Sequence, residues 1–129
     1  QKIATGSLFV SLVKDSHPNL GTGASREFGD PSYWLSTVLF DGGPSVRDEV
    51  MVELARHGIE SRPVFPPLHL MPPFRDLRRA STTDQSVRLA DQGLCLPNYP
   101  GLMPEQVTVM VEHMLAAADI ATTKTRNLE

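Results

Sequence analysis

Prolines constrain the middle of this chain more than any other feature. They occupy positions 66–67 and 72–73 and so enclose residues 68–71. Because a proline ring fixes φ and removes a backbone donor, the enclosed stretch has room for one helical turn at most. Pro63 likewise confines an extended segment, 60–65, to the edge or the end of a sheet. The sequence therefore predicts a stiff segment that displays its side chains from a fixed backbone.

Periodic apolar residues predict two amphipathic helices, over 45–57 and 104–118. Ser45 is placed to cap the first helix, and Gly58 to end it with a left-handed residue. Pro104 suits the first position of the second helix. The apolar stripes are Val46, Val50, Met51 and Leu54 in the first, and Val107, Met110, Val111, Met114, Leu115 and Ala118 in the second. Residues 1–14 are also expected to be helical, although Gly6 weakens that helix.

The remaining segments predict a small sheet. Residues 33–40 are rich in aromatic and β-branched side chains and end at a cluster of turn formers, and 94–96 reads as a short buried strand. A short helix that ends at Gly93 is expected to turn Val87, Leu89 and Ala90 inward. Residues 15–30 are expected to form a loop, with at most a short extended piece. The predicted fold class is α+β: a two-layer sandwich in which a small, mostly antiparallel sheet packs against helices.

The size and charge of the chain limit the classes of protein to which it can belong. Its 129 residues suit one domain, predicted over 1–120. A tail without apolar period, 121–129, is predicted to be disordered and to derive from a cloning vector. The formal charge of −3 argues against nucleic acid as a partner. Because no apolar run approaches membrane-spanning length and Cys95 has no partner for a disulfide, we expect a reduced, cytoplasmic protein that does not bind membranes.

Few residues offer chemistry of their own. The four histidines are not spaced from one another or from Cys95 as zinc ligands are, so we expect no metal site. Cys95 lies between two leucines, where desolvation raises the pKa of a thiol, which favours a buried structural role. Arg62 and His69 differ, because both stand on or beside the proline-rich segment. A guanidinium on a rigid backbone suits a carboxylate or phosphate ligand, and a surface ion pair or hydrogen bond is the alternative.

The order of motifs along the chain resembles the C-terminal domain of the DegT/DnrJ/StrS family. The resemblance rests on Tyr33-Trp34-Leu35, on Arg47 with Leu54, on Gly-Ile-Glu-Ser-Arg-Pro at 58–63, on Pro-Leu-His-Leu-Met-Pro at 67–72 with Phe74, and on Gly-Leu-Cys-Leu-Pro at 93–97. It covers roughly residues 1–118. Within the branch that acts on 4-keto-sugars, Phe65 stands where Trp is usual, Pro66 where Lys is, Met71 where Gln is, and Asn98 where Ser is common.

This resemblance implies a function that the chain would share with a larger partner domain. Members are pyridoxal-phosphate (PLP)-dependent sugar aminotransferases of aspartate-aminotransferase fold, which use glutamate to aminate a nucleotide-linked keto-sugar. The catalytic lysine and the cofactor site belong chiefly to the N-terminal, PLP-binding domain. We therefore expect no catalytic and no cofactor-binding residue here. The isolated chain is expected to be inactive and to bind no PLP, which the full-length enzyme would carry. Arg62 and His69, by motif position, would bind substrate, and the full-length enzyme would be a homodimer.

Two other functions stay open at this point. The chain could be a self-standing binding or scaffold module that kept the fold without the chemistry. It could also be a small independent enzyme that uses His69 as a general base. Loss of nucleotide-sugar binding in Arg62→Ala would favour the binding module, whereas loss of turnover in His69→Ala would favour the enzyme.

Overall fold

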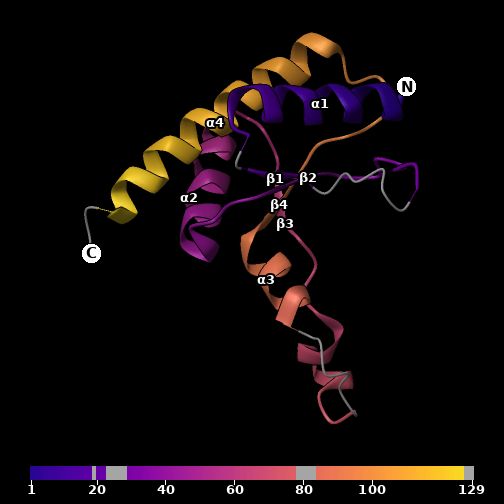
Figure 1. The fold of residues 1–129 in the computed structure, drawn as a ribbon, viewed down its shortest axis with the longest axis vertical. Coiled ribbons are helices and arrows are strands. Elements are labelled where there is room, and N and C mark those ends of the chain that lie inside the picture. Colours follow the sequence, from indigo (N-terminus) through magenta and orange to yellow (C-terminus); the bar gives the residue numbers. More distant parts are fainter. Residues whose placement is uncertain (19, 23–28, 78–83, 127–129) are drawn as a thin grey trace.

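The protein was analysed as a computed structural model, which describes residues 1–18, 20–22, 29–77 and 84–126. Three long helices lie together on one side of a small sheet: α1 (Lys2–Ser16), α2 (Gly43–Arg56) and α4 (Pro104–Arg126). Helix α4 packs against both α1 and α2 (Figure 1). A shorter helix, α3 (Asp84–Gln92), packs against α2. The expected α+β class is confirmed.

The sheet has four short antiparallel strands in the order β1-β2-β4-β3. They are β1 (Gly21–Thr22), β2 (Ser36–Leu39), β3 (Arg62–Pro63) and β4 (Gly93–Leu96). The proline-limited strand β3 lies at the edge, as predicted. Strand β4 is central, and all four of its residues are buried. The extended piece expected within 15–30 is β1, whereas residues 19 and 23–28 of that loop lie outside the described part of the chain.

The core forms where the helices cover one face of the sheet. Side chains alternate between faces along a strand, so Val38 and Leu94, which are paired in register, share the helix-covered face and are fully buried. The predicted stripe of α4 is buried throughout, from Val107 to Ala118. The other core residues are Phe9, Val13, Phe40, Val46, Val50, Leu54, Leu96, Leu102, Ala117 and Ala121.

The strand predicted over 33–40 is shorter at its start. Tyr33 has a φ of 49°, a left-handed conformation that interrupts extended backbone, and β2 begins only at Ser36. The ring of Tyr33 packs against α1 at Gly6. A Cβ at position 6 would overlap this ring. The glycine that weakens the helix locally is therefore required for packing.

Three local predictions were wrong. Ser45 does not cap α2: the helix begins two residues earlier with Gly42 at the N-cap, and Pro44 supplies a preset φ in the first turn. Leu89 does not face inward, since α3 has no buried residue and Leu89 is 43% exposed. Helix α4 does not fray at residue 121 but continues to Arg126, and the rest of the predicted tail lies outside the described residues.

Contacts from α4 to its neighbours explain why this helix continues past residue 120. Ala121 is 1% exposed, so small side chains keep the last turns close to the core. Asp119 accepts a hydrogen bond from Nε2 of His17, at the end of α1, at 3.2 Å. Lys124 forms an ion pair with Glu49 of α2 at 3.3 Å. These tertiary contacts stabilise helical turns that have no apolar period of their own.

Arg47 holds α3 in place. Its side chain is only 13% exposed, and its Nη1 donates to the carbonyl oxygens of Ala90 and Asp91 at 2.7 and 3.1 Å. A cation at the last turn of a helix satisfies free carbonyls and complements the helix dipole. Helix α3 therefore docks through its backbone carbonyl groups, while Leu89 stays exposed.

We predict that Arg47→Ala loosens α3 selectively. Loss of two charge-assisted hydrogen bonds should lower the free energy of unfolding by about 1–3 kcal/mol and speed amide hydrogen exchange within α3. The control is Arg56→Ala, which removes an arginine that is 70% exposed and pairs with Glu53 on the surface. This control should change stability by less than about 1 kcal/mol. Equal effects of the two variants, measured by urea denaturation, would contradict the role of Arg47.

Candidate functional site

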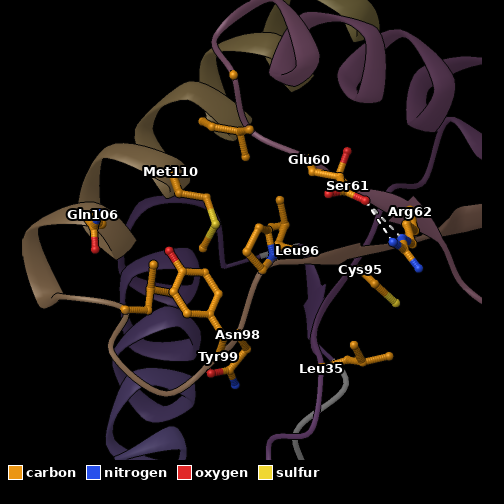
Figure 2. A pocket seen from close by; sticks show the side chains of 14 residues that line it. Leu35, Glu60, Ser61, Arg62, Cys95, Leu96, Asn98, Tyr99, Gln106 and Met110 are labelled. Carbon is orange, nitrogen blue, oxygen red and sulfur yellow. Dashed lines mark hydrogen bonds and ion pairs between the residues drawn. The ribbon is translucent and has the colours of Figure 1, made fainter.

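A cavity of about 530 Å³ opens where the sheet edge meets the start of α4 (Figure 2). Arg62 and Cys95 lie at one end of it, and Tyr99, Gln106 and Met110 lie at the other. Its size is within the range of small-molecule sites. We call it the Arg62 cavity. It is lined by Leu35, Gly58, Ile59, Glu60, Ser61, Arg62, Cys95, Leu96, Pro97, Asn98, Tyr99, Leu102, Gln106 and Met110.

The end of α2 directs the chain into this cavity. Gly58 has a φ of 72°, and the amide of Ile59 donates back to the carbonyl oxygen of Leu54 at 2.9 Å. This is the left-handed termination predicted from the sequence. It turns residues 60–62 toward the sheet, where Arg62 pairs in register with Cys95. The position of Arg62 at the cavity is thus set by a helix end and a strand pairing.

The Arg62 guanidinium is exposed and carries its own counterion. Its side chain is 78% exposed, and both Nη2 and Nε donate to Oε1 of Glu60, at 2.8 and 3.3 Å. These hydrogen bonds, together with the carboxylate charge, raise the pKa of Arg62. Arg62 therefore stays cationic, and an anionic ligand would compete with Glu60 for its donors.

Asn98 and Ser61 also line the cavity, although the sequence did not predict either of them as a site residue. Asn98 is 8% exposed, and its Nδ2 donates to the carbonyl oxygen of Tyr33 at 2.6 Å, which ties the loop after β4 to the left-handed residue. Within the described residues, Asn98 Oδ1 and Ser61 Oγ are buried and have no hydrogen-bond partner. The only sequence signal was the substitution of Asn98 at a position where the related proteins commonly have Ser.

His69 is not brought together with Arg62. It is half-buried on η1 (Leu68–Leu70), a single 3-10 turn, and it is not among the residues that line the Arg62 cavity. A second such turn, η2 (Pro72–Phe74), follows. Both turns belong to an arm, residues 66–77, which extends away from the sheet and from the three long helices (Figure 1). The structure thus places Arg62 at the cavity and His69 on the arm.

Cys95 is the buried thiol that the sequence predicts. It is 8% exposed, and its Sγ lies 3.8 Å from Oγ1 of Thr37 on the neighbouring strand. Burial raises the pKa of this thiol, while the hydrogen bond to Thr37 lowers it in part. A neutral thiol is a poor nucleophile, so the environment does not activate Cys95.

The Arg62 cavity lacks the lysine that a PLP site needs. PLP enzymes of this kind bind the cofactor through a lysine. The three lysines of the sequence are Lys2, Lys14 and Lys124, and none of them lines the Arg62 cavity. Among the described residues, no group of three or more His, Cys, Asp or Glu side chains is arranged to hold a metal ion. In that same part of the chain no helix is long and apolar enough to cross a membrane.

Solved structures share this fold closely. DesV of S. venezuelae superimposes with a TM-score of 0.76 at 24% identity, over 92% of this chain and 31% of that protein. PseC of Helicobacter pylori, an aminotransferase involved in the biosynthesis of pseudoaminic acid, gives a TM-score of 0.76 at 14% identity, over 92% of this chain and 32% of that protein. At such identities the likeness defines the fold alone: it is that of about one third of an aminotransferase.

The sequence then identifies the family. Residues 4–115 match the DegT/DnrJ/EryC1/StrS aminotransferase family, and the chain belongs to it. GDP-perosamine synthase of Caulobacter vibrioides is 39% identical over 90 residues, which are 67% of this chain and 22% of that protein. The GDP-perosamine synthase of Vibrio cholerae is 38% identical over 77 residues, 59% of this chain and 21% of that protein. The chain spans about a fifth of the length of these curated relatives.

We predict that Cys95 reacts slowly in the folded protein. Because burial raises its pKa above 9.0, the value for an exposed thiol, little thiolate forms near neutral pH. Alkylation by iodoacetamide should be at least about tenfold slower in the native state than in urea, and its rate should still rise with pH above 9.0. In Thr37→Val the rise should move to higher pH, because the hydrogen bond that lowers the pKa is lost. Equal rates in native and unfolded protein would contradict this.

Proposed function

We propose that this chain is the C-terminal small domain of a PLP-dependent aminotransferase that uses glutamate to aminate a nucleotide-linked keto-sugar. One observation carries the proposal: the family match over residues 4–115 coincides with a fold that fits about one third of solved aminotransferases. The family is PLP-dependent. The partner in this proposal is an N-terminal, PLP-binding domain that supplies the reactive lysine, in an enzyme that is a homodimer and is cytoplasmic.

The chain's own contribution in this proposal is binding. Arg62, cationic at the cavity rim, holds an anionic group of the substrate, either the phosphate of the nucleotide or a carboxylate of the amino donor. Ligand binding would displace Glu60 from the guanidinium. His69 contacts substrate from the arm, at a place separate from the Arg62 cavity. The larger domain supplies all covalent chemistry, because this chain has no lysine at the cavity.

The exposed apolar side chains of the arm support a partner domain. Solvent-exposed apolar clusters mark surfaces that another part of a protein covers. Four large apolar residues of the arm are 39% to 66% exposed: Leu68, Leu70, Phe74 and Leu77. In the proposed enzyme the arm would lie against the N-terminal domain or the second subunit.

We predict that the isolated chain does not bind PLP covalently. Mixed with PLP, it should show no visible absorption band of lysine-bound cofactor and no borohydride-reducible adduct by mass spectrometry, because its lysines lie outside the cavity. A stable reduced adduct on one lysine would contradict the assignment of the chemistry to another domain. Titration of the same sample with nucleotide sugars tests the alternative, since saturable binding that Arg62→Ala removes would favour a self-standing binding module.

A chimaera tests the proposed function directly. We expect amino transfer to survive when residues 4–115 replace the matching segment of the Caulobacter vibrioides GDP-perosamine synthase. In this chimaera Arg62→Ala should lower kcat/KM by about tenfold or more, as expected when about 1.4 kcal/mol of substrate binding is lost. Arg56→Ala, which removes an arginine of α2 that is 70% exposed and does not line the Arg62 cavity, is the matched control and should leave kcat/KM unchanged. Equal loss in both variants, or none in Arg62→Ala, would contradict the role of Arg62.

A further inference from the structure

Two large aromatic side chains stack on each other at the surface. Trp34 precedes β2 and is 64% exposed, and Phe65 follows β3 and is 65% exposed. Their ring centroids are 6.1 Å apart, and the ring planes differ by 16°. Burying aromatic surface is strongly favourable, so two stacked rings that leave most of their surface in water offer contact area to a ligand. We call them the aromatic pair.

A positively charged side chain lies next to Trp34. The ammonium group of Lys2, at the start of α1, lies 3.4 Å from the carbonyl oxygen of Trp34. Among the described residues, no carboxylate pairs with Lys2. Arg62 lines the same cavity as Leu35, the residue after Trp34, but its guanidinium is already paired with Glu60. The Lys2 ammonium group near Trp34 therefore favours a ligand that carries an anionic group.

A second cavity opens next to Trp34. It has a volume of about 280 Å³ and lies between α1 and the segment that leads into β2. Phe9 and Val10 of α1 line one side, and Trp34 lines the other. This volume is just below the range of drug-sized sites and suits a small group that is attached to a stacked ring.

We propose that the aromatic pair is a stacking platform for the planar heteroaromatic ring of a nucleotide, with Lys2 placed to bind its phosphate. Stacking on an aromatic side chain accepts any base, because every base has a π-face. The ammonium group then selects phosphorylated rings over neutral ones. The proposal deepens the proposed function, and it rests on that function for the identity of the ring as the base of a nucleotide-linked sugar.

Trp34 is the only tryptophan of the chain, so tryptophan fluorescence, excited selectively over Tyr33 and Tyr99, reports on this platform alone. Titration of the 129-residue protein with GMP is expected to quench this fluorescence saturably. Phe65→Leu keeps the reporter and removes its stacking partner, and it should weaken GMP binding by about fivefold or more. Phe74→Leu, which changes an exposed phenylalanine outside the aromatic pair, is the matched control and should leave binding unchanged.

The phosphate contact is tested separately. Lys2→Ala should weaken binding of GMP but not of guanosine, whereas Lys14→Ala, on the same helix, should change neither. Quenching that is absent, that is equal in wild type and Phe65→Leu, or that inorganic phosphate alone reproduces would overturn the proposal. A spectral shift on concentrating the protein without ligand would also overturn it, in favour of a contact between copies of the chain.

These results are independent of the chimaera. Quenching that depends on Phe65 would support the platform even if the chimaera failed to transfer an amino group. Conversely, a chimaera with Arg62-dependent activity would support the proposed function even if GMP did not quench Trp34. The two proposals can therefore fail separately.

Discussion

Burial of strand β4 on every side is the constraint on which the rest of the structure depends. Its backbone pairs with β2 along one edge and with β3 along the other, and all four of its residues are buried. Leu94 and Leu96 face the helices, while Cys95 lies between Thr37 and Arg62 on the opposite face. A shift of β4 by one residue would turn Cys95 toward the helices and Leu94 and Leu96 away from them, which is why the register is strongly specified. The Arg62 cavity exists because this register places Arg62 beside Cys95 and Leu96.

An exposed ion pair and a buried neutral thiol characterise the Arg62 cavity. Arg62 and Glu60 are both more than three quarters exposed, so their ion pair is screened by water and an anion can replace the carboxylate at little cost. Cys95 is held as a neutral thiol, and the lysines lie elsewhere. Among the described residues, the lining of the cavity thus includes an exposed guanidinium and a neutral thiol but no lysine. The chain matches about a fifth of the length of each curated relative.

Local sequence rules predicted the elements well where one physical cause dominated. Gly58 ends α2 because a left-handed residue is cheapest without a Cβ, and Pro63 lies at a sheet edge because it lacks a donor. The same rules failed where a distant residue intervened. Leu89 is exposed because Arg47 docks α3 through its carbonyl groups, and α4 continues past residue 120 because His17 and Glu49 contact its last turns.

The sequence by itself determined the class of fold and the helical stripes, because spacing and proline geometry act within a few residues. The substrate-binding roles of Arg62 and His69 came from the resemblance to a family and stay predictions. Only the tertiary structure decided that Arg62 lines a cavity and that His69 lies on the arm, outside that cavity. It also brought together Trp34 and Phe65, which no periodicity connects. Such contacts depend on strand register and on how one segment turns against another, and these are set by the packing of the whole chain.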